Sequence, residues 1–345
     1  MNSKDIRIVF MGTPEFAVET LKTLVENKYN VVGVVTQPDK PVGRHQESLQ
    51  ALAVKQYALS VGLPVLQPVK MKDPDFISQL QELNADIFVV VAFRMLPEVV
   101  WAMPRLGTFN IHAALLPQYR GAAPINWAVI NGEKETGVTT FFLDKDIDTG
   151  RIILQKHFPI PEDANVECVY DGLMKLGADI AVETIELVAS KIPETMAKSD
   201  FKEILDAISV SQDSLDTSNL KHAPKIFKET CEINWNNSAK HINDFVRGLS
   251  PYPGAWAQLC SLNEPKTKSS TVLKIFKTRL TDKPSSGTPG MLHIEKSRLF
   301  VNTTDSLLEL LEVQLSGKKR MDAGSFLNGF KDLESFCLKS SNSKE

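Results

Sequence analysis

Cysteine is scarce in this chain of 345 residues, which holds only four copies. They lie far apart and none forms a C-x-x-C pair, which disfavours both a disulfide framework and a zinc site. This usage fits a reducing cytoplasm, and no metal is expected. The four positions are Cys168, Cys231, Cys260 and Cys337.

Long apolar runs and a strong net charge are also lacking. No apolar run reaches the ~18 residues that a transmembrane helix needs, so no membrane partner is expected. The start "MNSKDIRIVFMG" leads into a strand pattern without a small-residue cleavage site, so no signal peptide is expected. The net charge is −3, but residues 211–345 hold 19 basic and 15 acidic side chains. Such a basic part is compatible with a polyanionic partner or with an ordinary solvated face.

Glycine-rich nucleotide motifs are missing as well. The first apolar strand, residues 6–11, leads into "FMGTPEF", with one glycine where a dinucleotide-binding fold shows G-x-G-x-x-G. We therefore expect no NAD or ATP at this turn. Gly12 is interpreted as a tight strand-to-helix turn, with Thr13 as the N-cap and Pro14 as the first helical residue.

Apolar strands and amphipathic helices alternate through the first 200 residues. Continuous apolar runs such as 31–35 are typical of parallel strands that are buried on both faces. "GVTTFFL" and "RIILQKHF" flank an acidic loop and predict an antiparallel hairpin. The alternation predicts an α/β fold with a doubly wound, Rossmann-like sheet. Further strands are expected near "PVLQP", at 85–93 and at 108–112, and helices at 47–60, 74–83, 124–131 and 165–190.

The character of the sequence changes near residue 200. A polar stretch without a strong period predicts a linker at 206–220, between a first domain at 1–205 and a second at 221–345. The second domain begins with a helix in "NNSAKHINDFVRGLS". Short strand patterns spaced by Gly, Pro and Ser turns follow, which favours a small β-barrel of the OB type.

Two polar residues end the apolar strand "TFNIH". Asn110 and His112 are two positions apart and therefore project to the same side. In open α/β sheets, ligands bind outside the carboxyl ends of the strands, where this pair is expected. A lone buried histidine would more often be a satisfied core residue. The pair, with Pro117 and a glycine turn directly after it, favours a functional site.

The loop "LDKDIDTGR", residues 143–151, carries three alternating aspartates. A calcium-binding EF-hand loop that began at Asp144 would need glycine sixth and glutamate twelfth, where Thr149 and Gln155 stand. Calcium is therefore excluded. Asp144 is explained by a solvated turn, whereas Asp148, beside a Thr-Gly pair, is a candidate site residue.

Asn, His and Asp without a neighbouring Ser or Cys nucleophile fit direct attack of a substrate amine on a carbonyl held by a cofactor. The amide and the imidazolium would donate to the developing oxyanion, a contribution of about 3 kcal/mol per donor. The carboxylate would orient the imidazole and help to remove the amine proton.

In the order N-x-H…L-L-P-x-Y-R-G-A-A-P…D-T-G, the chain resembles the folate-dependent formyltransferases. "TQPDKPVGR" and, far downstream, "RGLSPYPGAW" are similar to the branch of that family that acts on tRNA. The resemblance extends over almost the whole chain. It implies an enzyme that transfers a formyl group from 10-formyltetrahydrofolate to the α-amino group of initiator methionyl-tRNA, with reduced folate as the product.

The resemblance also implies site residues. Asn110, His112 and Asp148 would be catalytic. The OB-like barrel would hold the tRNA backbone, and no metal would be needed. The remaining implied contacts are Ala114, Leu115, Leu116 and Pro117 along the folate, Phe93, Met95 and Leu96 at the pterin pocket with the loop of Asp146, and Lys40 and Arg44 at the tRNA.

Two departures from the family pattern stand out. Ala114 replaces the usual serine, and "GRHQESLQ" after Val42 lacks the second glycine and the lysine of a basic loop. The loop is therefore expected either to bind tRNA more weakly and with a shallower salt dependence, or to bind through Arg44 alone with its other residues solvated. Arg94 is interpreted either as a pocket-rim residue or as a surface arginine, and "SGKKR" at 316–320 as a phosphate patch or a turn.

Two alternatives remain open. One is a formyltransferase for a sugar nucleotide or another small amine, which would keep the three polar residues but lack the tRNA-branch stretches. The other is a tRNA- or folate-binding relative that does not catalyse. A monomer is the simpler expectation for a two-domain tRNA-binding chain.

Overall fold

The computed structural model describes residues 2–42, 48–192, 201–263, 270–330 and 332–340. The chain divides into two compact units. The first unit comprises Met1–Gly121, Glu135–Pro159 and Tyr170–His222, and the second comprises Ala122–Lys134, Ile160–Val169 and Ala223–Glu345. Within the described residues, no helix has the length and apolarity to cross a membrane.

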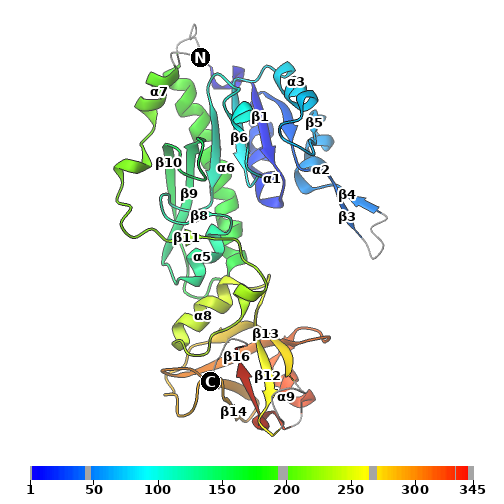
Figure 1. The fold of residues 1–345 in the computed structure, drawn as a ribbon, viewed down its shortest axis with the longest axis vertical. Helices are drawn as coiled ribbons and strands as arrows, with labels where there is room; N and C mark the ends of the chain where they lie inside the picture. The colour runs from blue at the N-terminus through cyan, green and yellow to red at the C-terminus, as the bar shows by residue number, and fades with distance from the viewer. Residues whose placement is uncertain (1, 43–47, 193–200, 264–269, 331, 341–345) are drawn as a thin grey trace. The chain divides into compact units, whose positions relative to one another are not determined.

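The first unit is built on a seven-stranded sheet, with the order β10-β9-β7-β6-β1-β2-β5 (Figure 1). Its central strands are parallel, and the β9–β10 hairpin adds antiparallel strands at one edge. Both the alternating α/β pattern and the hairpin predicted from the sequence are confirmed. The strands are β1 (Ile8–Gly12), β2 (Val31–Val35), β5 (Val65–Leu66), β6 (Ile87–Val91), β7 (Thr108–His112), β9 (Glu135–Phe142) and β10 (Ile152–Pro159).

Helices cover both faces of this sheet, as the doubly wound prediction requires. On one face, α6 (Val166–Lys191) packs so closely on β7 that a Cβ added at Gly177 would lie 3.6 Å from Ile111. On that face α1 (Glu15–Glu26) meets α6 through an edge-to-face contact of Phe16 with Tyr170. On the other face, side chains of β1 and β6 form one core cluster with α3 (Pro74–Glu82) and α4 (Glu98–Trp101).

Three local predictions were wrong. Pro14, not Thr13, is the N-cap of α1, because its ψ of 173° is extended and the helical turn begins one residue later. The helix expected over 47–60 is shorter: α2 (Ala53–Ser60) follows β4 (Ser48–Gln50), whose backbone pairs with β3 (Lys40–Val42). The segment taken as aperiodic contains α7 (Phe201–Ile208), and Val210 bridges Ile152 beyond it.

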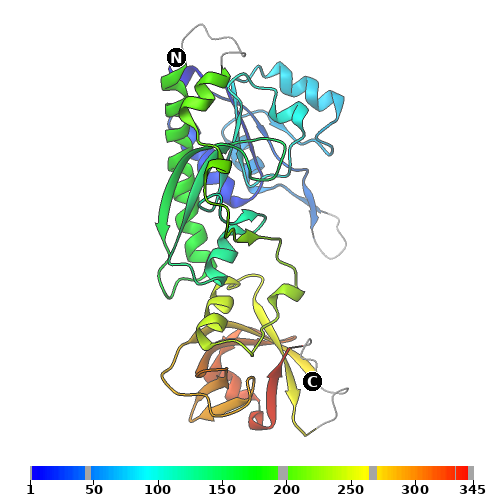
Figure 2. The same ribbon diagram turned by 60° about the vertical axis from the view of Figure 1, so that its left-hand side comes forward.

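The second unit holds an antiparallel sheet of order β14-β15-β16-β13-β12-β18, with β17 paired to β16. Its strands are the yellow to red arrows in Figure 2. An isolated bridge from Met291 to Cys337 joins the two ends of this order, as the OB-like prediction requires. Ser238 caps α8, the helix predicted ahead of the strands. The elements of this unit are α5 (Pro124–Ile130), α8 (Ala239–Gly248), β12 (Ala255–Ser261), β13 (Ser270–Arg279), β14 (Leu292–Glu295), β15 (Arg298–Asn302), β16 (Leu307–Leu315), β17 (Met321–Asp322), α9 (Ala323–Gly329) and β18 (Phe336–Lys339). The short strands β8 (Arg120–Gly121) and β11 (His222–Ala223) form a separate two-stranded sheet.

Candidate active site

Asn110 and His112 end β7 on the sheet face opposite α6. Their neighbour Ile111 packs toward α6, and residues that alternate along a strand face opposite sides. His112 is 6% exposed, whereas Asn110 is half-buried and its side chain has no hydrogen bond within the described residues. The sequence prediction that the pair shares one side of the strand is confirmed, and the amide of Asn110 is free to donate to a ligand.

Two oxygen atoms flank the imidazole of His112. Its Nε2 atom lies 2.9 Å from the backbone oxygen of Tyr119. A carbonyl only accepts hydrogen bonds, so Nε2 carries the proton that is donated. The other nitrogen, Nδ1, lies 3.8 Å from Oδ2 of Asp148. The imidazolium form therefore directs its second N–H toward a carboxylate.

Asp148 is held in a tight loop between β9 and β10. Its Oδ2 accepts the backbone N–H of Gly121 at 2.9 Å, and its φ of +56° places it in the left-handed region. Gly150 is required nearby, since a Cβ there would lie 1.6 Å from the carbonyl oxygen of Phe142. The Asp-Thr-Gly sequence thus supplies both the carboxylate and the backbone turn that presents it.

The segment after β7 is fixed by two polar side chains that the sequence analysis missed. The hydroxyl of Thr139 donates to the carbonyl of Ala114 at 2.6 Å and accepts the N–H of Leu116 at 3.1 Å. Gln155 donates to the carbonyl of Leu116 at 2.8 Å and to the Thr139 hydroxyl at 3.0 Å. Ala114 is fully buried, so the residue that replaces serine presents no methyl group to solvent. Threonines within the apolar run "GVTTFF" were the available signal.

Arg94 is a structural residue of the segment that follows β6. Its guanidinium donates to the carbonyl of Val69 at 2.9 Å and also to that of Pro68. These bonds tie the segment after β6 to the segment after β5. Neither interpretation of Arg94, as a pocket-rim residue or as a surface residue, predicts these two hydrogen bonds, because the two segments are far apart in the sequence.

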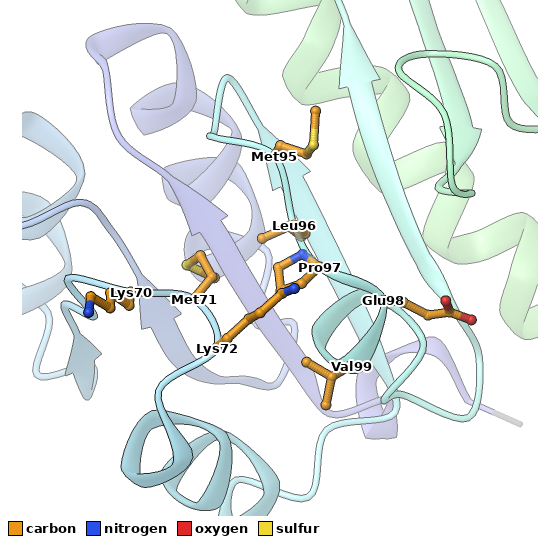
Figure 3. Close-up of a pocket in the computed structure, with 8 residues that line it drawn as sticks. All are labelled: Lys70, Met71, Lys72, Met95, Leu96, Pro97, Glu98 and Val99. Atoms are coloured by element: carbon orange, nitrogen blue, oxygen red, sulfur yellow. The ribbon is translucent and has the colours of Figure 1, made fainter.

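A pocket of about 810 Å³ is lined by the residues that follow Val69 and Arg94 in the chain (Figure 3). Figure 3 shows that two chain segments line it, namely Lys70, Met71 and Lys72 and the run Met95, Leu96, Pro97, Glu98 and Val99. Met95 and Leu96, expected at the pterin, are among these residues, and Met95 is 71% exposed. Phe93 is half-buried and does not line this pocket, nor do the three catalytic candidates.

The other predicted contacts are distributed more widely. Leu115 and Pro117 are half-buried and Leu116 is buried. Asp146 is exposed, and its N–H donates to Asp144 at 3.2 Å. Lys40 begins β3, and Arg44 lies outside the described residues. Residues 316–320 connect β16 to β17, with Arg320 paired to Glu312. In the part of the chain that the structure describes, no three His, Cys, Asp or Glu side chains gather as a metal site.

Comparison with known protein families assigns both parts of the chain to one family. Residues 6–185 match the family described as formyl transferase, and residues 225–331 match its C-terminal domain. The chain therefore belongs to the formyl transferase family.

Its relatives place it more narrowly. The chain is 53% identical over 339 residues to a methionyl-tRNA formyltransferase of Parabacteroides distasonis, covering 98% of this chain and 100% of the relative. It is 45% identical to the methionyl-tRNA formyltransferase of Flavobacterium johnsoniae, covering 94% and 96%. Within the family, these similarities lie with the methionyl-tRNA formyltransferases.

Solved structures share the fold at lower identity. A sugar 3N-formyltransferase, WlaRD, crystallised with dTDP and 5-N-formyl-THF, aligns with a TM-score of 0.58 at 18% identity and covers 91% of this chain and 99% of its own. An N-formyltransferase from Helicobacter canadensis aligns with a TM-score of 0.58 at 20% identity, covering 92% and 100%.

Proposed function

We propose that this chain transfers the formyl group of 10-formyltetrahydrofolate to the α-amino group of initiator methionyl-tRNA. The observation that carries the proposal is the meeting of Asn110, His112 and Asp148 at the carboxyl end of β7. The identity with methionyl-tRNA formyltransferases along nearly the whole chain supports the choice of acceptor.

The three side chains have distinct proposed roles as the neutral amine attacks the formyl carbon. The free amide of Asn110 donates to the formyl oxygen as negative charge develops there. The Nε2–H of His112 donates to the carbonyl of Tyr119 at 2.9 Å, and in this scheme it also donates to the formyl oxygen. Asp148 orients the imidazole and accepts the proton that the attacking nitrogen loses. After the new C–N bond has formed, the bond from the formyl carbon to the folate nitrogen breaks, and that nitrogen takes up the proton that Asp148 received from the amine.

The folate donor supplies the formyl carbon in this scheme, and we propose that its pterin ring binds in the first unit at the pocket of Met95 and Leu96. Pterin rings are flat and partly apolar, and the pocket at Met95 and Leu96 is lined by methionine, leucine, proline and valine side chains. Thr139 and Gln155 hold the backbone of residues 114–117, which we propose to lie along the donor.

The acceptor is assigned to other parts of the chain. We propose that Lys40 and Arg44 contact the tRNA, and that the barrel within 221–345 holds its backbone, while residues 1–205 catalyse and 206–220 link the two. The proposal includes a monomer that works in the cytoplasm. The four cysteines, all free thiols, suit a reducing compartment.

The acceptor is tested by supplying the chain with labelled 10-formyltetrahydrofolate and either methionyl-tRNA or an amino sugar nucleotide. The expected product is formylated methionyl-tRNA, with no label on the sugar nucleotide. Label on the sugar nucleotide alone would assign the chain to the other acceptor class. Binding of the folate and of methionyl-tRNA without any formyl transfer would indicate a relative that does not catalyse.

A further inference from the structure

We propose that Gln212 is a positioning residue of the formyl transfer, holding the Asp148 loop against the segment that contacts His112. The inference rests on the proposed function for its catalytic consequence. Gln212 lies in the stretch that the sequence analysis interpreted as a linker, outside every motif of the site.

The contacts of Gln212 join two separate parts of the site. Its Nε2 atom donates to the backbone carbonyls of Asp148 at 2.9 Å and of Gly150 at 2.7 Å. Its Oε1 atom accepts both Nη2 of Arg120, at 2.6 Å, and Nε of the same guanidinium, at 3.1 Å. One side chain therefore bonds the loop that carries the catalytic carboxylate and the residue next to Gly121, the donor to that carboxylate.

Gln212 is 1% exposed, so its amide has exchanged water for these partners completely. A buried amide that loses its hydrogen-bond partners destabilises the fold by about 1–3 kcal/mol. The partners of the Gln212 amide are therefore held in a defined geometry. Both polar atoms of the Gln212 side chain have partners, in the Asp148 loop and in Arg120, the residue that follows Tyr119.

The segments that Gln212 joins contain backbone that needs support. Asp148 has a φ of +56° and Tyr119 a φ of +60°, both in the left-handed region, which L side chains disfavour. Such residues cost about 1–3 kcal/mol each and persist where surrounding contacts fix them. The Asp148 carbonyl is fixed by Gln212, and the Tyr119 carbonyl accepts from His112. The two strained residues therefore present the two groups that flank the imidazole.

The backbone of Gln212 is anchored without its side chain. Val210 exchanges two backbone hydrogen bonds with Ile152, at 2.8 and 2.9 Å. Arg151 donates to the hydroxyl and carbonyl of Ser209 at 2.9 and 2.8 Å. A substitution at Gln212 therefore changes the contacts to the site while Ser209 and Val210 stay bonded to Arg151 and Ile152.

Two substitutions separate the halves of the Gln212 contact. Gln212→Met has nearly the same shape and removes all four hydrogen bonds. Gln212→Glu keeps an acceptor for Arg120 but removes both donations to the loop. The matched control is Gln118→Met, because Gln118 also bonds the same stretch, donating to the carbonyl of Asn219 at 3.3 Å, but forms no hydrogen bond with the Asp148 loop within the described residues.

The kinetic experiment compares kcat and KM of the full chain in formylation of methionyl-tRNA. Both Gln212 variants are expected to lower kcat about 10- to 100-fold, with KM for either substrate changed less than about threefold, because a misplaced catalytic group slows the reaction more than it weakens binding. Gln118→Met is expected to retain the wild-type kcat. A wild-type kcat in Gln212→Glu would overturn the proposal, as would equal losses in Gln118→Met and Gln212→Met.

A second readout does not depend on activity. The Gly121 amide, which Asp148 accepts, is expected to exchange with solvent deuterium at least about tenfold faster in both Gln212 variants, because the loop that holds its acceptor is released. Unchanged Gly121 exchange would overturn the proposal. If the wild-type chain formylates neither acceptor, the proposed function fails, while the exchange rates still decide whether Gln212 holds the loop.

Discussion

The Nδ1 atom of His112 lies 3.8 Å from Oδ2 of Asp148, although 36 positions separate the two residues in the chain. The closer partner of the carboxylate is the N–H of Gly121, at 2.9 Å. Catalytic contacts are often long before substrate binds and tighten in the complex. The N–H of Gly121 thus holds the Asp148 carboxylate beside the imidazole, although the carboxylate and the imidazole do not form a direct hydrogen bond with each other.

This relationship predicts the effect of Asp148→Asn. The amide keeps an acceptor oxygen for Gly121, but it neither carries charge toward His112 nor takes a proton. We expect kcat to fall about 10²- to 10⁴-fold with little change in thermal stability, measured by initial formylation rates and by thermal unfolding.

The control for that variant is Asp144→Asn in the same loop. Asp144 accepts the hydroxyl of Thr149 at 2.7 Å and is exposed, and asparagine preserves this acceptor. Its kcat is expected to equal that of the wild type. An equal loss in both variants would mean that Asp148 acts only through the shape of the loop.

Thr139 and Thr140 are adjacent and lie on opposite faces of β9. Substituting each in turn distinguishes an effect on the 114–116 segment from an effect on the stability of the whole fold. Thr139 bonds the 114–116 segment, whereas Thr140 bonds Thr184 of α6 at 2.8 Å. Valine at either position leaves buried partners unsatisfied and should lower the free energy of unfolding by about 1–3 kcal/mol. Only Thr139→Val is expected to raise KM for the formyl donor, by several-fold. Equal KM values in the two variants would contradict a role for that segment in donor binding.

A buried carboxylate in the barrel, that of Glu309, is expected to make the free energy of unfolding depend on pH. Glu309 of β16 is 3% exposed at its side chain, and hydrogen bonds from Arg298 and Arg279 lower its pKa from 4.5 to about 2. Because the folded state binds this proton less readily, the stabilisation is complete above pH 4.5 and is lost as the pH falls toward 2. It amounts to something on the order of 3 kcal/mol.

Glu309→Gln should therefore destabilise the chain strongly at pH 7 and much less near pH 2.5, as followed by urea unfolding. Glu312→Gln, on the same strand, changes a more exposed ion pair with Arg320 and is expected to have a small effect at both pH values. If Glu309→Gln lowers the free energy of unfolding by the same amount at both pH values, the charge of the carboxylate does not account for its stabilising effect.

Arg44 is predicted from the resemblance alone. Arg44→Ala is expected to raise KM for methionyl-tRNA several-fold and to reduce the salt dependence of that KM, since one phosphate contact is lost. Folate binding should be unchanged. Lys22 of α1, whose side chain is 44% exposed, offers a control, and the same increase in Lys22→Ala would indicate a nonspecific charge effect.

The sequence predicted those features that depend on local pattern. Continuous apolar runs gave the parallel strands, and the two-residue spacing of Asn110 and His112 placed both on one face. Asp148 was a candidate because a carboxylate in an Asp-Thr-Gly turn is poorly explained by solvation. These inferences need only the period of the strand and the chemistry of the side chains.

The supporting residues were not predictable, because their roles depend on contacts between distant segments. Gln212 is 64 residues beyond Asp148 and follows a polar stretch that resembles a linker. Arg94 bonds carbonyls 25 and 26 residues earlier, which no local motif records. The N-cap of α1 was misplaced by one residue because Thr13 and Pro14 both suit the start of a helix.

The central claim is tested most directly by single-turnover formylation of methionyl-tRNA, with the chain in excess over labelled 10-formyltetrahydrofolate. The wild-type chain is predicted to formylate the tRNA. Asn110→Ala and His112→Ala are each predicted to slow transfer about 10²-fold or more while still binding the folate. No formylated methionyl-tRNA from the wild type, or an unchanged rate in both variants, would contradict this account of the site.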